Sequence, residues 1–367
     1  MFPKETGTPQ GASLSPILLL VYLEHILRTY PRQELIRSGR AVEISYADDV
    51  VIAMREEARD AGHARHAYRA ECTCMRCEME TLERTLPAQF ARYDMQMNEG
   101  KTMRGEVGPR ENTIPAVLGC EVSGEKEVVA RRRRVAAAFQ ALTRVWKQSK
   151  LPRAMKVKLY KSMVEPHFTY CGGAIALTKT EKLDAMHRKQ LRCVLGVFYP
   201  AHLSNVEVYN QAGTIPVSVK CVAARLSLMG HVLRGAADSD RAAYSAMTAY
   251  FRRRAAQGED PRARMRRGRV LTMVPRVLRL DMQLVGKARR AAMFGAEGLE
   301  TGTDLAKLKL VAANREKWKC NVECLRDAAM KKWVIENVKT SDKRKLAKAR
   351  YEARRRAVEE EKKEEQE

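Results

Sequence analysis

The stretch Tyr46-Ala47-Asp48-Asp49 places two adjacent carboxylates between two β-branched runs, residues 42–45 and 50–53. Two such runs joined by a short polar tip predict a β-hairpin with both aspartates at its turn. Adjacent carboxylates on a tight turn repel each other unless a cation lies between them. Mg²⁺ takes oxygen ligands and usually needs one or two carboxylates together with substrate phosphates. The hairpin therefore predicts a metal site at Asp48 and Asp49 suited to phosphoryl transfer, and the plain alternative is a solvated acidic turn.

The chain is strongly basic, with 68 lysines and arginines against 44 acidic residues and a formal net charge of +24. A chain this basic is usually drawn to a polyanion, and the nucleic-acid backbone is the commonest one. The positive charge is densest between residues 252 and 290, where thirteen Lys or Arg stand against three acids. This segment is a candidate phosphate contact, and a disordered basic linker is the alternative. A merely soluble basic surface is the alternative for the chain as a whole.

The apolar runs are too short for a membrane span, since the longest covers residues 17–23 and a span needs about 20 residues. The first fifteen residues lack the basic-then-apolar order of a signal peptide. We therefore expect no membrane partner and an intracellular location, cytoplasmic, nuclear or both. In such a reducing compartment we expect the nine cysteines to be thiols.

Three of the cysteines, Cys72, Cys74 and Cys77, cluster downstream of His63 and His66. Histidine and cysteine are the residues that hold zinc in proteins, so a metal site is one interpretation. Their spacing matches no common zinc motif, however, and the segment 56–86 has a helical composition. A helix carrying packed thiols is the favoured interpretation.

The remaining patterns indicate a change from mixed to helical structure along the chain. We expect a helix over 16–28 that buries Ile17, Leu18, Val21, Leu23 and Ile26. A long helix over 56–94, broken near Pro87, and short strands over 101–105 and 116–122 should follow. From residue 130 to 235 the apolar spacing is helical throughout, and the final residues 342–367 have the composition of a solvated helix or a disordered tail.

Two motifs together carry a family resemblance. The loop Gly7-Thr8-Pro9-Gln10-Gly11 leads into Ser15-Pro16, and Tyr46-Ala47-Asp48-Asp49 follows about thirty residues later. In this order and spacing they resemble the palm of a reverse transcriptase. The resemblance implies that Gln10, Gly11 and Tyr46 shape the nucleotide pocket and that Asp48 and Asp49 bind Mg²⁺ or Mn²⁺.

Further segments resemble other parts of the same family. Asn98-Glu99-Gly100-Lys101-Thr102 is similar to the element that places a lysine beside the incoming triphosphate, so Lys101 would neutralise charge on the leaving pyrophosphate. A surface lysine in a turn is the alternative. The segment 117–122 is similar to the hairpin that grips the primer end. Segments 159–166, 170–172, 191–196 and 228–234 resemble the thumb of non-LTR (LINE-type) retrotransposon polymerases, whereas the thumb of group II intron maturases is not recognised.

The resemblance implies an α+β fold, with a truncated palm over 1–128, a helical thumb over 129–235, a basic helical extension over 236–341 and a charged tail over 342–367. It implies an RNA-directed DNA polymerase with deoxynucleotide triphosphates, an RNA template and a DNA primer or target as partners. The family also uses a third carboxylate on a strand before the Gly7–Gly11 loop, for which the sequence has no room. We therefore expect a fragment with little activity alone, which an N-terminal half supplied by a longer polypeptide would complete. The alternative is a non-catalytic nucleic-acid-binding protein.

Overall fold

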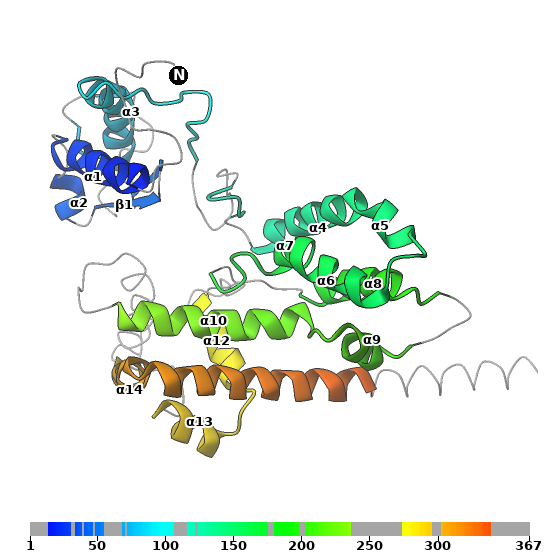
Figure 1. Cartoon of the computed structure of the whole chain (residues 1–367). Coiled ribbons are helices and arrows are strands. Elements are labelled where there is room, and N and C mark those ends of the chain that lie inside the picture. The colour runs from blue at the N-terminus through cyan, green and yellow to red at the C-terminus, as the bar shows by residue number, and fades with distance from the viewer. Residues whose placement is uncertain are drawn as a thin grey trace, which may run out of the picture. The chain divides into compact units, whose positions relative to one another are not determined.

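The protein is described by a computed structural model, which divides into a first unit, Met1–Gly105, and a second unit, Glu106–Glu367. The described residues are 14–30, 34–38, 40–46, 48–54, 68–69, 72–105, 116–121, 124–174, 180–198, 203–235, 274–295 and 302–338. They are mostly helical with one small antiparallel sheet, which confirms the α+β class (Figure 1). The boundary predicted at 128/129 falls inside a helix, because helical structure begins at Gly124.

The first unit is built from helices α1 (Ser15–Arg28), α2 (Glu34–Arg37) and α3 (Met75–Ala91) and strands β1 (Ala41–Tyr46) and β2 (Asp49–Met54). The two strands pair antiparallel, and Tyr46 lies opposite Asp49 at the closed end. One face of the hairpin packs on a core from α1 and α3, which includes Ile26, Leu27, Leu82 and Phe90. The buried faces of α1 and α3 therefore hold the inward face of the hairpin in place.

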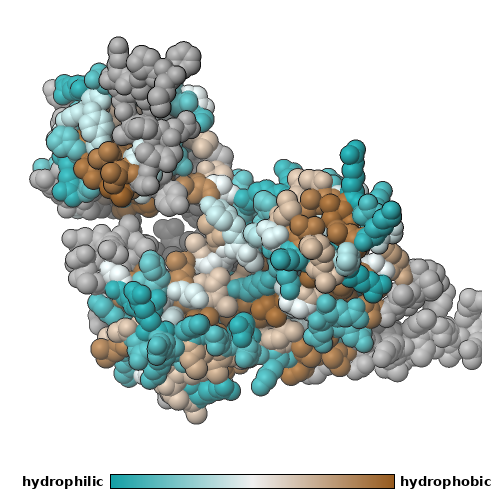
Figure 2. All heavy atoms as spheres, in the orientation of Figure 1, coloured by the Kyte–Doolittle hydropathy of each residue, from teal (hydrophilic) through white to brown (hydrophobic). Residues whose placement is uncertain are grey.

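Helix α1 has the predicted bounds within one residue but buries a narrower face than predicted. Leu23 and Ile26 are buried as expected, whereas Ile17, Leu18 and Val21 are 57%, 53% and 62% exposed. The helix is apolar on nearly every side, so the spacing of its apolar residues does not single out one buried face. Figure 2 shows the resulting hydrophobic patch over α1.

Three other expectations for the region around residues 55–122 were wrong. Helix α3 begins at Met75, after an irregular stretch at Cys72 to Cys74, and it continues through Pro87 instead of breaking there. Residues 102–105 are irregular, and the segment 116–122 forms only an isolated bridge between Val117 and Cys120. A tight two-residue turn explains the bridge, because the intervening Leu118 and Gly119 both have positive φ.

The second unit is helical in its described part, as predicted for 130–235. Its helices are α4 (Gly124–Ala141), α5 (Thr143–Lys147), α6 (Arg153–Met163), α7 (Pro166–Thr169), α8 (Glu181–Leu195), α9 (Asn205–Ala212), α10 (Val217–Arg234), α12 (Val274–Met282), α13 (Lys287–Phe294) and α14 (Gly302–Ala313), followed by a helix over 315–338. Figure 1 shows α14 and the helix after it running beside α10.

In the described residues, the helices before residue 235 and those after residue 274 share one hydrophobic core. Tyr160, Leu191, Phe294 and Trp318 belong to one hydrophobic core. Buried polar contacts reinforce the junction, since Arg225 on α10 pairs with Asp281 on α12 at 2.6 Å (Nε to Oδ2). The apolar faces of helices after residue 274 close the core that 124–235 begins. Residues 236–273 and the predicted tail over 342–367 lie outside the described residues.

Among the described helices, none alone is long and apolar enough to cross a membrane. The bent pair α9 and α10, which meet at 62°, reaches that length and composition together. Many of its apolar side chains, including Val208, Leu226 and Leu233, are buried in the core of the second unit.

Candidate nucleic-acid interface and metal sites

The predicted acidic hairpin is present in the first unit. Strand β1 ends at Tyr46 and strand β2 begins at Asp49, so that Asp48 lies in the short connection between them. Both carboxylates are exposed. Asp49 is therefore in the strand ladder opposite Tyr46, and only Asp48 lies in the turn itself, which corrects the prediction that both lie at the turn.

Side chains alternate between the two faces of a strand, so the register shows what shares a face with Asp49. The outward residues Val42 and Ile44 lie on that face. Val42 and Ile44 are 39% and 49% exposed. The opposite face, with Val50 and Ile52, packs on the core. Asp49 thus stands at the end of an exposed apolar strand face.

Lys101 lies in a tight turn of the same unit, with its side chain exposed. Its backbone N–H donates to Asn98 Oδ1 at 3.1 Å and to Asn98 O at 3.0 Å. The asparagine therefore shapes the turn that presents the lysine. No hydrogen bond or ion pair of the described residues joins Lys101 to Asp48 or Asp49. The predicted pocket residues Gln10 and Gly11, and the side chain of Tyr46, lie outside the described part of the chain.

A groove of about 1850 Å³ lies in the second unit. Helix α4, helix α8, the start of α9 and the end of the helix over 315–338 form its walls. Among the described residues, its lining includes no acid and five cations: Arg132, Lys182, Arg188, Lys189 and Arg192. Phe139 and Phe198 also face it, and Phe198 is 63% exposed. A basic groove with an exposed aromatic ring is typical of surfaces that bind single-stranded nucleic acid, where cations contact the phosphates and rings stack on the bases.

The groove holds some of its cations in fixed positions. Arg192 donates from Nη2 to Asn205 Oδ1 at 2.9 Å and to Leu203 O at 3.2 Å. The Arg188 guanidinium lies 5.9 Å from the centre of the Trp333 ring. Burial, and then the neighbouring charge of Arg188, lower the pKa of Arg192. Binding of an anion would reduce the electrostatic repulsion between these neighbouring guanidinium groups.

The basic run Arg131 to Arg134 divides its residues between the core and the surface. Arg131 is fully buried and donates from Nε to Glu127 at 2.9 Å and from Nη1 to Phe168 O at 2.6 Å. Arg134 donates to Gly119 O and to Glu127. Arg132 lines the groove, and the exposed Arg133 does not. Of the four consecutive arginines, Arg131 and Arg134 therefore stabilise the fold, and Arg132 contributes to the groove.

A second polar cluster, around Glu165, has a structural role in the core of the second unit. Glu165 Oε1 accepts from Thr214 Oγ1 at 2.6 Å and from Lys220, and His187 Nε2 lies 3.3 Å away. Burial alone raises the pKa of Glu165, but the interactions with His187, Lys220 and Thr214 outweigh it and lower that pKa to about 2. Burial lowers the pKa of His187, which is enclosed by aromatic rings including Tyr160.

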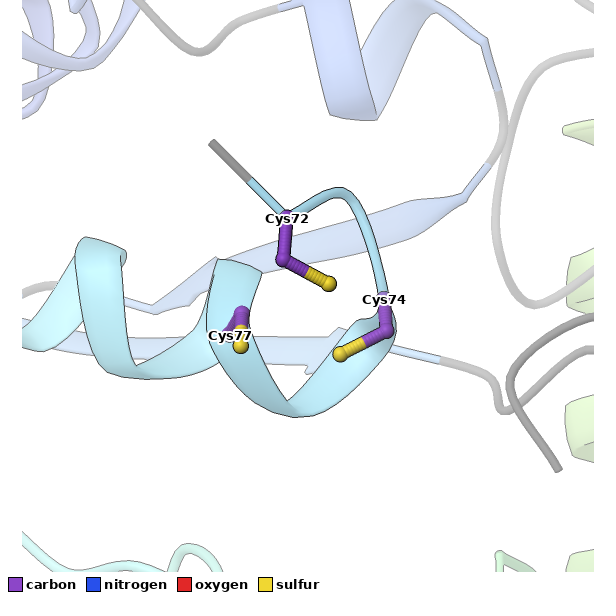
Figure 3. Close-up of side chains that lie close together, drawn as sticks. All are labelled: Cys72, Cys74 and Cys77. Carbon is purple, nitrogen blue, oxygen red and sulfur yellow. The ribbon is translucent and has the colours of Figure 1, made fainter. Parts of the chain in front are cut away.

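The three clustered cysteines come together in the first unit, contrary to the favoured sequence interpretation. Their Sγ atoms lie within 4.8 Å of one another, and among the described residues no other group of three His, Cys, Asp or Glu side chains converges in this way (Figure 3). The helical composition of 56–86 misled that interpretation, because α3 begins only after Cys74.

The groove was not predicted from the sequence, because its cations come from separated segments. The usable signal was the spacing of α8, where Arg188 and Arg192 are four residues apart and lie on the side away from the buried Leu191 and Val194. Comparison of the chain with protein-family models, with curated proteins and with solved structures finds no match.

Proposed function

We propose that this chain is part of an RNA-directed DNA polymerase of the non-LTR retrotransposon type. The observation that carries the proposal is the acidic hairpin, in which Asp48 lies in the short connection between the strands and Asp49 begins the return strand. Exposed carboxylates that are close together in the chain are able to take Mg²⁺ or Mn²⁺ as oxygen ligands. The motif order from Gly7 to Lys101 supports the same proposal.

In this proposal Asp48 and Asp49 provide oxygen ligands for a divalent ion. The ion's charge stabilises the attacking and leaving oxygens of nucleotidyl transfer when it is bound. Lys101, presented by the Asn98 turn, neutralises charge on the triphosphate of the incoming nucleotide. The basic groove of the second unit takes the phosphate backbone of the RNA template and the DNA primer.

The groove also favours a second function, a non-catalytic nucleic-acid-binding protein. The described lining of the groove, with five cations and no acid, binds a polyanion whether or not chemistry follows. Both functions use the groove, and they differ only in whether the hairpin binds a catalytic metal ion.

A primer-extension assay on a homopolymeric RNA template with Mg²⁺ or Mn²⁺ separates the two. Incorporation that Asp48→Asn abolishes supports the polymerase. The matched control is Asp94→Asn, because Asp94 is an exposed acid of the same unit in a left-handed conformation that asparagine tolerates. RNA binding without incorporation, unchanged by Asp48→Asn, supports the binding protein and contradicts catalysis by this chain.

Metal binding at the hairpin has a readout that needs no turnover. Fe²⁺ in place of Mg²⁺ cleaves the backbone near its site in the presence of a reductant and peroxide. Cleavage close to residue 48 is expected in the wild-type chain and in Asp94→Asn, and its loss is expected in Asp48→Asn. Equal cleavage in all three proteins contradicts a metal site at the tip.

A further inference from the structure

A group of three thiols lies at the start of α3 in the first unit. Cys72 is on the irregular stretch before the helix, Cys74 is at the N-cap position, and Cys77 is in the first turn. Their three Sγ atoms lie within 4.8 Å of one another (Figure 3). Cys74 and Cys77 are 5% and 1% exposed, and Cys72 is half-buried.

The backbone brings the three together through a local change of direction. Cys74 has φ −69° and ψ 152°, an extended conformation that ends the preceding stretch and starts the helix. Cys77 follows three residues later at the third helical position, and the side chain of an N-cap residue lies beside the second and third positions of its helix. The C-x-C-x₂-C spacing thus makes a compact set of ligands although it matches no common zinc motif.

The distances suit a thiolate-bound metal ion. Zinc binds cysteine sulfur at about 2.3 Å, which in a tetrahedron puts the sulfur atoms about 3.8 Å apart. The three sulfur atoms already lie within 4.8 Å of one another. Side-chain rotations that move each sulfur atom by about 1 Å or less therefore bring them to the tetrahedral separation. The thiolates also need a cation, because buried like charges repel each other strongly.

Two features of the surroundings favour thiolates at this place. The backbone N–H of Arg69 points at Cys77 Sγ, with N to Sγ at 3.5 Å. N–H donors to a ligand atom orient it and stabilise its negative charge. Cys74 at the N-cap and Cys77 in the first turn also lie at the N-terminal end of α3, where the helix dipole is positive.

We propose that Cys72, Cys74 and Cys77 bind one Zn²⁺ ion through three thiolates, leaving the fourth position to a ligand that is not cysteine. This site is separate from the acidic hairpin tip and goes beyond the proposed polymerase or nucleic-acid-binding function. Soft thiolate ligands select zinc over Mg²⁺ or Mn²⁺, which prefer oxygen.

The ion acts as a structural clamp. Arg40, next to β1, already donates from Nη2 to Thr73 O at 2.7 Å and from Nη1 to Glu78 Oε1 at 2.7 Å. These bonds tie the stretch before α3 to the start of the hairpin. Zinc adds direct bonds between that stretch and the helix, so its binding stabilises the folded first unit by mass action.

The test uses the full chain, reduced and stripped of metal. Titration with Co²⁺ should give one equivalent of binding, with a near-ultraviolet thiolate-to-cobalt band whose intensity corresponds to three sulfur ligands, and Zn²⁺ should displace it. Cys72→Ser and Cys77→Ser should each weaken Zn²⁺ binding, measured by competition with a chromophoric chelator, by more than about 100-fold, the upper end of what loss of an outer partner causes.

The matched control is Cys320→Ser, which removes an exposed cysteine of the second unit and should leave stoichiometry and affinity unchanged. Because Cys72 is only half-buried, Cys72→Ser keeps the test usable if Cys77→Ser fails to fold, as circular dichroism would show. The proposal is overturned by the absence of stoichiometric Zn²⁺ binding to the reduced chain, or by binding that Cys72→Ser leaves intact.

A second readout follows the fold instead of the metal. Zn²⁺ should slow proteolysis of the first unit in the wild-type chain and in Cys320→Ser, and should have no effect in Cys72→Ser. Neither readout involves RNA, primer or incorporation, so failure of the zinc site and failure of the proposed function are distinguishable. Protection that persists in Cys72→Ser contradicts the clamp.

Discussion

The indole of Trp318 lies directly against the backbone of Gly230, so that a Cβ on Gly230 would come within 2.2 Å of Trp318 Nε1. The indole has no free space to move into, because it is 2% exposed and its Nε1–H donates to Leu226 O at 3.0 Å. Gly230 belongs to the 228–234 segment that resembles a polymerase thumb. The absence of a side chain there is what lets the helix over 315–338 approach α10.

Gly230→Ala should therefore destabilise the second unit by about 3 kcal/mol, the upper end of the usual cost of overpacking. The measurement is urea unfolding followed by circular dichroism. Gly286→Ala is the matched control, because nothing lies within 4 Å of its Cβ position, and it should change stability by less than about 1 kcal/mol.

A double variant isolates the contact. In a Trp318→Ala background the clash is gone, and alanine is the better helix former by about 1 kcal/mol. Gly230→Ala should then be neutral or slightly stabilising. An equal cost in both backgrounds would show that Trp318 is not the reason for glycine at position 230.

The buried Arg131 should be essential for stability. Arg131→Met leaves Glu127, which is 0% exposed, without its main cation, although Arg134 still reaches it. Removing one partner of a buried pair usually costs about 3–5 kcal/mol, and we expect about 3 from denaturant unfolding. Arg133→Met, an exposed change two residues along the same helix, should cost less than about 0.5 kcal/mol. A similar loss of stability in Arg131→Met and Arg133→Met would contradict the assignment of Arg131 to the core and Arg133 to the surface.

The two faces of α1 should respond differently to truncation. Leu23→Ala removes a side chain that is 3% exposed and should cost about 2–5 kcal/mol. Val21→Ala removes one that is 62% exposed and should cost less than about 0.5 kcal/mol. Thermal unfolding of the two variants measures the difference. A large loss with Val21→Ala would mean that another surface covers this face in solution.

Acid should destabilise the second unit in two steps. Burial lowers the pKa of His187 from 6.5, so the unfolded chain takes up a proton first and stability begins to fall as pH drops below 6.5. The pKa of Glu165 falls from 4.5 to about 2 on folding, so its contribution is complete above 4.5 and is lost toward pH 2. The shift corresponds to about 3 kcal/mol, reduced by solvent screening to about 2.

Glu165→Gln isolates the second step. The variant should be about 2 kcal/mol less stable than the wild type at neutral pH, and this gap should narrow as pH falls below 4.5. Urea unfolding at a series of pH values measures it. Other buried acids titrate equally in both proteins and cancel in the difference. A gap that stays constant from neutral pH to pH 3 would contradict a charged Glu165 as its source.

Features set by local pattern were predictable from the sequence. The hairpin followed from two β-branched runs around a short tip, and the helices of the described part of 130–235 followed from the helical spacing of apolar residues. Features set by distant packing were not. The buried side of α1 depends on where α3 lies, and the core shared by Tyr160 and Trp318 joins segments far apart in the chain.

The candidate sites show the same limit. Asp48 and Asp49 were found because adjacent carboxylates are visible in the sequence, whereas the groove is assembled from α4, α8 and two later segments. The cysteine cluster depended on where α3 starts, and helix boundaries are the least certain part of a pattern. Composition showed that a polyanion partner was expected but not which cations would meet it.

Arg132 and Arg133 give the sharpest test of the groove, because they are adjacent on α4 and only Arg132 lines it. Arg132→Ala should weaken binding of the chain to single-stranded RNA and lower the slope of log affinity against log salt by about 1, the effect of one lost phosphate contact. Arg133→Ala should leave the slope unchanged. Fluorescence anisotropy at several salt concentrations measures both, and RNAs of different sequence should lose affinity equally, because a phosphate contact carries no sequence information. Equal slopes for the two variants would mean that RNA binds elsewhere on the chain.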